Sequence, residues 1–258
     1  MTEAELLAAL PDMVFRAILL LARIGAVVML MPGLGEQEVP TNIRLGLGFA
    51  LVIVLHPVLA PALPAAPDSA GELLRLILVE IIIGIWYGAL ARLVTLAMSM
   101  AGQLFALLIG LSQVLVPDPA TGGQNAITGR FFTLISVLLF LTTGLYALPL
   151  RALAESYAVM PVGEGFLAGP GAEAMAEAVG KSLIVALQLV APFFLLSVVL
   201  NVAFGLMARI APQVQIYFLV VPGQLLLGML LLGLLLPSML GLYASIARET
   251  FLALPGTR

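Results

Sequence analysis

Residues 73–111 read LLRLILVEIIIGIWYGALARLVTLAMSMAGQLFALLIGL, an apolar stretch that contains no proline. A helix that crosses a membrane needs about 20 mostly apolar residues. This stretch has about twice that number and would be roughly 58 Å long as one helix, whereas the hydrocarbon core of a bilayer is about 30 Å thick. The sequence therefore predicts either a hairpin of two spans, or one helix that leaves the membrane and is covered there by protein.

Further apolar segments lie on both sides of this stretch. They are residues 14–31, 45–63, 131–150, 172–207 and 213–247, with loops expected at 61–71, 112–129 and 155–171. The last two segments are again longer than one crossing, and Pro192, Pro222 and Pro237 offer kinks or breaks. We expect an all-α, polytopic integral membrane protein with about five or six long hydrophobic helical segments, some kinked or hairpin-like, in a single membrane domain over residues 1–258.

The composition supports a membrane protein and excludes several other classes. Hydrophobic residues make up 62% of the chain and charged residues only 10%, whereas a soluble domain carries about a quarter charged residues. Basic residues are scattered along the chain, so the positive-inside rule does not determine the membrane orientation. The same scatter leaves no basic patch that would bind nucleic acid. The chain has no cysteine, so it has no disulfide or thiolate metal site. Glu3 and Glu5 stand where a cleaved signal would carry basic residues, so we expect the first segment to be retained.

Small and polar residues recur at spacings of three or four within residues 73–111. On a helix they fall within an arc of roughly 80°. Such a seam lets helix backbones approach closely, either within the chain or against neighbouring subunits or a conduit. The seam consists of Gly84, Gly88, Arg92, Thr95, Ser99, Gly102, Ala106 and Gly110.

A few polar side chains lie at membrane depth and are expected to be buried. Charge is costly there and therefore faces protein or water, so Glu80 and Arg92 predict partners at helix–helix contacts. Arg23 lies deep in the first segment and is expected to face protein as well. Asn201 and Arg209 share one helix face, which predicts contact with another helix, or alternatively with a substrate.

The loop that follows residues 73–111 begins apolar and becomes turn-like. It contains Val114, Leu115 and Val116 ahead of a stretch rich in Gly, Pro, Asp and Asn. Irregular backbone at membrane depth survives only where protein or a watery cavity satisfies it. The loop is therefore either a plain surface loop, or a segment inserted in a pore with these three residues as a constriction.

Catalytic constellations are missing from the sequence. His56 is the only histidine, and there is no phosphate-binding loop, paired-carboxylate motif or metal-ligand spacing. We therefore expect no enzyme, no cofactor and no metal. Two other functions stay open. A secondary transporter for a small solute would be expected to contain inverted repeats. An intramembrane enzyme would need reactive partners, which His56 and Glu80 lack.

A series of short landmarks runs through nearly the whole chain. In order they are Pro40-Thr-Asn-Ile-Arg44 before a helix ending at Pro57, Glu80 with Gly84 and Gly88, Ala101-Gly102-Gln103, Gly110-Leu111, Asp118-Pro119, Phe140-Leu-Thr-Thr-Gly144, Ser156-Tyr157, Pro161-Val-Gly163, Ala191-Pro192, Asn201, Gly205, Arg209, Pro212-Gln213 and Pro222. On this ordered set the chain resembles the FliR family of flagellar export-gate proteins and its counterparts in virulence type III secretion. Two stretches depart from the flagellar pattern: Gly144-Leu145-Tyr146, where many members have a histidine, and Val214 to Tyr217, where many read Met-Asn-Val-Phe. The system is therefore left open, with the flagellum favoured.

The resemblance implies a role and partners. The chain would be a non-enzymatic, multi-pass subunit of the export gate in the bacterial inner membrane, at the flagellar basal body. Its partners would be two small sister membrane proteins (FliP-like and FliQ-like), an FlhB-like switch protein, unfolded export substrates and the lipid bilayer. Residues 1–170 and 171–258 would be two structurally distinct halves that resemble the two sister folds.

The resemblance also implies a pore plug in the loop after Gly110. The candidate plug residues are Leu111, Val114, Leu115, Val116, Pro117, Asp118 and Pro119.

Overall fold

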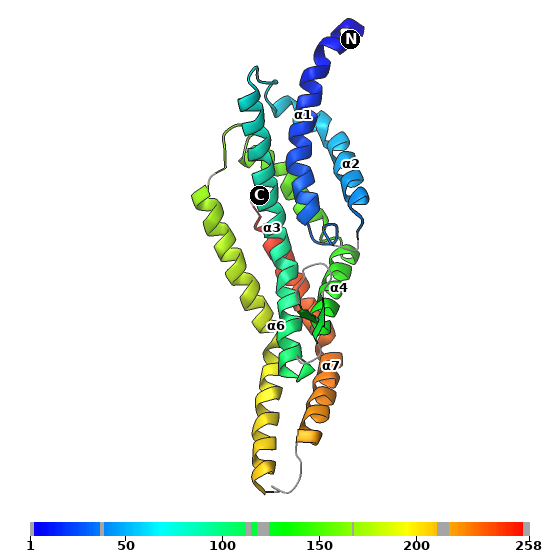
Figure 1. Ribbon diagram of the computed structural model, residues 1–258, viewed down its shortest axis with the longest axis vertical. Coiled ribbons are helices and arrows are strands. Elements are labelled where there is room, and N and C mark those ends of the chain that lie inside the picture. The colour runs from blue at the N-terminus through cyan, green and yellow to red at the C-terminus, as the bar shows by residue number, and fades with distance from the viewer. Residues whose placement is uncertain are drawn as a thin grey trace. The chain divides into compact units, whose positions relative to one another are not determined.

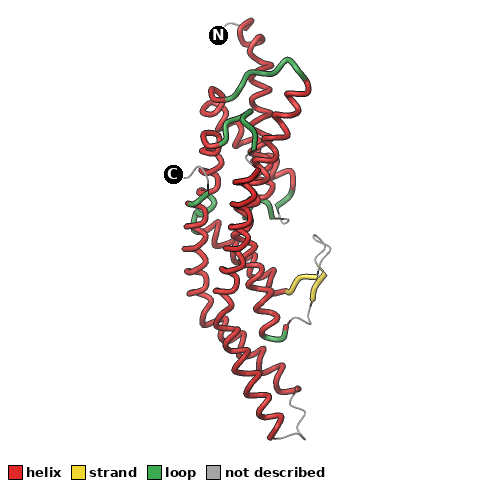
Figure 2. The backbone as a smooth tube through the Cα atoms, turned by 90° about the vertical axis from the view of Figure 1, so that its left-hand side faces the viewer, coloured by secondary structure: helices red, strands yellow, loops and turns green. Residues whose placement is uncertain are grey.

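The computed structural model describes residues 3–36, 39–111, 115–117, 124–166, 168–210 and 217–254, and these are almost entirely helical (Figure 1; Figure 2). The strands among them are two of three residues each, which form one antiparallel hairpin. In chain order the elements are α1 (Glu3–Leu30), α2 (Thr41–Leu59), the 3-10 turn η1 (Ala60–Ala62), α3 (Ala70–Leu108), β1 (Leu115–Pro117), β2 (Gln124–Ala126), α4 (Ile127–Thr142), α5 (Ala147–Val159), α6 (Ala168–Ile210) and α7 (Tyr217–Leu252).

The long central stretch is one helix rather than a hairpin. Near the start of α3, the Ser69 hydroxyl accepts a hydrogen bond from the Glu72 N–H at 3.1 Å, as a helix-capping side chain does. Beyond its end Gly110 adopts φ +81°, the left-handed conformation in which many helices stop. Between these two points α3 continues without a break. An unbroken helix pairs its backbone N–H and C=O groups within itself, so it needs no water to satisfy them.

The number of candidate membrane spans agrees with the prediction of five or six. Five helices of the described chain are long and apolar enough to cross a membrane, and the pair α4 and α5 would make a sixth if counted as one span. α6 and α7 stay helical through Pro192, Pro222 and Pro237.

One predicted span has a different form in the structure. The sequence predicted a single segment over residues 131–150, but α4 and α5 meet at a bend of 71°. Gly144, which lies in the break, has φ +73°, a conformation that L side chains rarely adopt. The apolar composition had hidden this break, because a hydrophobic segment looks the same whether it is straight or bent.

The contacts divide the chain into two compact units, which cut across the long helices. The first unit comprises residues 1–93, 143–178 and 248–258, and the second comprises residues 94–142 and 179–247. This division does not test whether residues 1–170 and 171–258 are distinct halves, which stays a prediction. In the first unit α1 packs along α2, and a core of Phe15, Leu19 and Leu76 forms between α1 and α3 (Figure 1).

In the second unit the core is aromatic. The ring of Phe105 on α3 lies 4.7 Å from that of Phe193 on α6 and 5.8 Å from that of Phe132 on α4. Tyr243 on α7 shares a hydrogen bond of 2.6 Å with the Ser136 hydroxyl, and its own hydroxyl donates to the Val94 carbonyl. These contacts tie α3, α4, α6 and α7 together within the unit.

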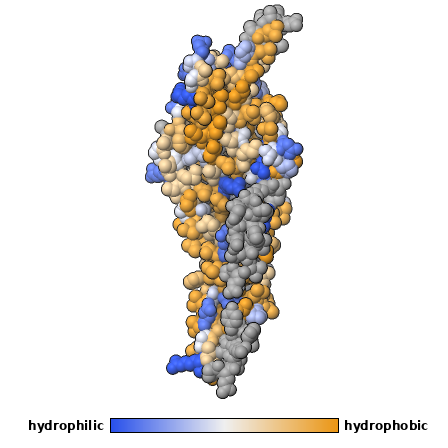
Figure 3. Space-filling view, viewed as in Figure 1, coloured by the Kyte–Doolittle hydropathy of each residue, from blue (hydrophilic) through white to orange (hydrophobic). Residues whose placement is uncertain are grey.

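Much of the described surface is apolar (Figure 3). Large side chains such as Ile53 on α2 and Leu234 on α7 are 73% and 71% exposed. Water would disfavour so many exposed apolar side chains, whereas lipid or an apolar partner would solvate them. The surface is thus that of a protein embedded in a membrane or in a larger membrane assembly.

Candidate functional site

The loop between α3 and α4 has a short paired neck. Leu115, Val116 and Pro117 form β1, which pairs with Ala126, Asn125 and Gln124 of β2, respectively. Leu111 lies just beyond the end of α3 and is half-buried. Three of the candidate plug residues, Val114, Asp118 and Pro119, lie outside the described residues.

The return of this loop into α4 is anchored on α3. The Thr128 hydroxyl donates to the Gly102 carbonyl at 2.8 Å. A Cβ atom on Gly102 would lie 2.6 Å from the Thr128 carbonyl oxygen and 2.8 Å from the Cα atom of Gly129. The backbones of α3 and α4 are therefore in close contact here, and a side chain at position 102 would force them apart.

The departure of the loop from α3 is held by α7. The side-chain amide of Gln224 donates to the Leu108 carbonyl, and Ile109 lies against Gly228. Sequence reasoning missed both α7 residues. The available signal was a glutamine inside an apolar stretch, which calls for a hydrogen-bond partner.

The seam on α3 makes contacts within each unit. In the first unit a Cβ on Gly84 would lie 2.5 Å from the Arg23 carbonyl oxygen, and one on Gly88 would lie 2.8 Å from Leu30 Cβ, so both glycines face α1. In the second unit Gly102 faces α4, as described above. Thr95 is buried at 4% exposure. The Ser99 carbonyl oxygen faces Gly129 on α4, and Gly110, which lies beyond the end of α3, has no atom within 4 Å of its Cβ position.

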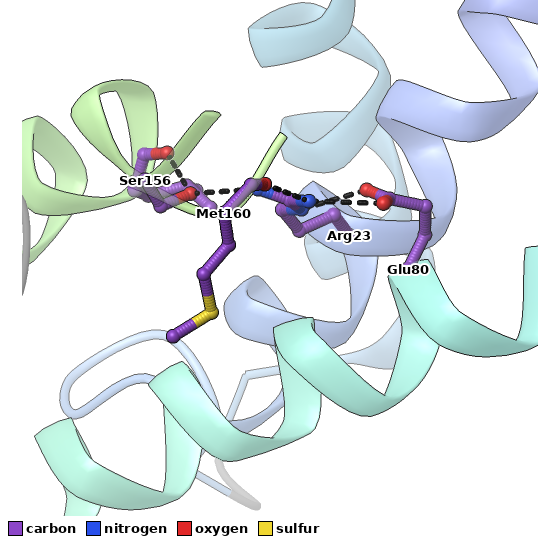
Figure 4. Close-up of polar contacts among 5 residues, drawn as sticks. Arg23, Glu80, Ser156 and Met160 are labelled. Atoms are coloured by element: carbon purple, nitrogen blue, oxygen red, sulfur yellow. Dashed lines mark hydrogen bonds and ion pairs between the residues drawn. The ribbon is translucent and has the colours of Figure 1, made fainter. Parts of the chain in front are cut away.

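A buried polar cluster joins α1, α3 and α5 in the first unit (Figure 4). Arg23 is fully buried and makes a two-pronged ion pair with Glu80, with Nε to Oε2 at 2.6 Å and Nη2 to Oε1 at 2.9 Å. Its Nη2 also donates to the Met160 carbonyl at 2.9 Å, and its Nη1 donates to the Ser156 hydroxyl at 3.2 Å. The guanidinium carbon lies 4.1 Å from the centre of the Tyr157 ring.

The contacts of this cluster hold the three helices together without a covalent bond. Planar guanidinium groups suit both two-pronged carboxylate binding and stacking on an aromatic ring. Both oxygens of Glu80 accept hydrogen bonds from Arg23, and Ser156 in turn donates to the Leu153 carbonyl at 2.6 Å. The charges are satisfied inside the protein, which is how buried ionic groups are tolerated at membrane depth.

The other predicted polar residues are less buried in the single chain. Arg92 is half-buried and donates to the Gly35 carbonyl at 3.5 Å. Asn201 and Arg209 are exposed, so for them the expectation of burial does not hold within this chain. Asn201 donates to the Ser197 hydroxyl one turn earlier on α6, at 3.2 Å. Burial of these two residues would require contacts from outside the chain.

The described residues contain no group of three or more His, Cys, Asp or Glu side chains that could hold a metal ion. The polar groups that they bring together, around Arg23 and around the base of the loop, are arranged to join helices.

Comparison with known proteins places the chain in a family. Residues 14–250 match the family model described as bacterial export proteins, family 1. The flagellar biosynthetic protein FliR of Caulobacter vibrioides is 31% identical over 216 residues, which cover 84% of this chain and 86% of the relative. Its namesake in Pectobacterium carotovorum is 30% identical, covering 83% and 82%. That of Escherichia coli K12 is 29% identical, covering 84% and 82%.

Proposed function

The chain belongs to the bacterial export proteins, family 1, with homologues named flagellar biosynthetic protein FliR over most of its length, and from this premise we propose that it helps to form and plug the flagellar export gate. It is a non-enzymatic, multi-pass membrane component of the flagellar export apparatus. The observation that carries the proposal is the family match over residues 14–250, together with the candidate membrane spans of the described chain.

In the proposed gate the chain joins two small sister membrane proteins, FliP-like and FliQ-like, and works beside an FlhB-like switch protein. Unfolded export substrates would cross the inner membrane through the resulting channel at the flagellar basal body. The largely apolar exposed faces of α2, α6 and α7 support this proposal, because such faces need lipid or apolar partners. The exposed Asn201 and Arg209 on α6 further favour protein neighbours, since lipid offers no partner for them.

The partner proposal is tested by purification. A tagged chain, expressed with its two sister proteins and extracted in mild detergent, should elute as a stable particle far larger than 27.0 kDa that contains both sisters. A monomer or a simple homodimer under the same conditions would contradict the proposal. That outcome would favour the small-solute transporter instead, which uptake into proteoliposomes by the chain alone would establish.

The plug proposal is supported by the position of the loop. It leaves one end of α3 and returns into α4, its neck carries Leu115, Val116 and Pro117, and both of its ends are fixed to neighbouring helices. A hydrophobic constriction blocks ions because water leaves a narrow apolar passage. We propose that residues 111–119 supply this constriction in the closed gate.

Polar substitution in the neck should make the closed gate leak. Leu115→Asn and Val116→Asn, each in cells that carry the complete apparatus, are expected to raise passive potassium efflux severalfold, because amide side chains let water and ions enter an apolar constriction. Val159→Asn at the exposed end of α5 is a matched control and should leave efflux unchanged. Unchanged efflux in both neck variants, at normal levels of assembled gate, would show that the neck is not a seal.

A further inference from the structure

The end of α3 is satisfied by a side chain from a distant part of the sequence. The last carbonyl groups of a helix have no partner within it, and a continuing helix would satisfy the Leu108 carbonyl with the N–H four residues further on. Here Gln224 on α7 donates its Nε2 amide to that oxygen at 2.5 Å, across 116 positions of sequence. Two backbone bonds close the same turn, from Ile109 N–H to the Phe105 carbonyl and from Gly110 N–H to the Leu107 carbonyl.

A second contact lies one turn along the same face of α7. Gly228 is four residues after Gln224, so both residues face α3. Ile109 is 2% exposed. A Cβ on Gly228 would overlap the Cγ2 atom of Ile109 and lie 3.0 Å from its Cβ atom. The absence of a side chain at position 228 therefore lets Ile109 dock on α7.

These two contacts hold consecutive residues at the point where the loop begins. Gln224 holds Leu108, Gly228 receives Ile109, and Gly110 then turns the chain with φ +81°. At the other end of the loop, Thr128 of α4, the helix that directly follows β2, donates to the Gly102 carbonyl on α3. The departure point is thus held by α7, whereas the return point is held where α4 packs against α3.

We infer that Gln224 and Gly228 are positioning residues for the plug, because they end α3 at Leu108 and fix the point from which Leu111 and β1 leave. This inference rests on the proposed function of the loop. It assigns to α7 a task beyond packing, since a shift of α7 relative to α3 would withdraw the amide from the Leu108 carbonyl and free the base of the plug.

The test compares Gln224→Leu and Gly228→Ala with Gly233→Ala in cells that carry the complete apparatus. Potassium efflux per assembled gate is expected to rise about tenfold in the first two variants. A tenfold change in population corresponds to about 1.4 kcal/mol, which is the order of the cost of losing the part-buried Gln224 hydrogen bond or of overpacking at Gly228. Gly233 lies on α7 with no atom within 4 Å of its Cβ position, so alanine there should leave efflux unchanged.

A rescue experiment separates positioning from general damage. Ile109→Ala removes the Cγ2 atom that the new methyl group of Gly228→Ala would overlap and keeps only the Cβ atom at 3.0 Å, so the double variant should bring efflux back toward the wild-type value. Val116→Asn serves as the direct test of the plug in the same cells. Restored efflux in the double variant, with raised efflux in each of Gln224→Leu and Gly228→Ala, supports the inference.

The remaining outcomes overturn it in distinguishable ways. If Val116→Asn leaks but Gln224→Leu and Gly228→Ala do not, the loop is a plug that α7 does not position. If the α7 variants only lower the amount of assembled gate, with normal efflux per gate, their role is packing. If none of the variants leaks, including Val116→Asn, the plug proposal fails and the inference fails with it.

Discussion

Arg23→Met is expected to destabilise the chain by about 3–5 kcal/mol, because it leaves the buried carboxylate of Glu80 without its partner. The same change removes the hydrogen bonds that Ser156 and the Met160 carbonyl accept, and the stacking on Tyr157. The expected result is a large loss of folded, detergent-soluble protein. The measurement is the fraction of chain that remains monodisperse after heating, compared with wild type across a temperature series.

Two further variants identify the cause of the loss. Arg23→Met combined with Glu80→Leu removes both charges, so the double variant should be more stable than Arg23→Met alone, although the side chain at position 23 is the same. Arg151→Met is the matched control, since Arg151 pairs with Glu155 at 2.7 Å but its side chain is 71% exposed. It should change stability little. A double variant no more stable than Arg23→Met would show that the loss does not come from an unpaired Glu80 carboxylate.

The sequence allowed the spans and the charged positions to be predicted, but not the pairing of those charges. Helices that are hydrophobic all round carry no clear amphipathic stripe, so hydrophobic periodicity does not show which face each one buries. Arg23 was expected to face protein, yet its partners lie 57 positions away at Glu80 and 133 away at Ser156. Nothing local in the sequence relates these residues, because helix packing brings them together.

The contacts at the base of the loop and the exposed polar residues show two further features that could not be predicted from the sequence. The role of Gln224 depends on where α3 ends, because its partner is the carbonyl of the last helical residue, Leu108. The turn that follows, at Gly110 with its positive φ, could not be located from an apolar sequence. Asn201 and Arg209 looked buried because polar groups at membrane depth usually are, but the single chain leaves them exposed. Their environment depends on other molecules, which one sequence does not describe.

The close approach of α1 and α3 leads to the second large effect, at Gly84. Gly84→Ala would place a methyl carbon 2.5 Å from the carbonyl oxygen of Arg23 and 2.8 Å from Ala26 Cβ. The Arg23 oxygen belongs to the backbone of α1, which cannot rotate away as a flexible side chain can, so the two helices must separate. Overpacking of this kind typically costs about 1–3 kcal/mol, and here the shift also displaces Arg23 from Glu80. The expected result is a clear drop in the temperature at which the detergent-solubilised protein unfolds.

Gly71→Ala on the same helix makes the same chemical change with the opposite expected sign. Gly71 has no atom within 4 Å of its Cβ position, so its methyl group meets open space. Alanine favours a helix over glycine by up to about 1 kcal/mol, so this variant should unfold at the same temperature as wild type or slightly higher. If Gly84→Ala behaved like Gly71→Ala, α1 and α3 could not be in backbone contact at Gly84. A drop in Gly84→Ala alone would show that the small-residue seam acts, at this point, to bring α1 against α3 and so to hold the Arg23–Glu80 pair together.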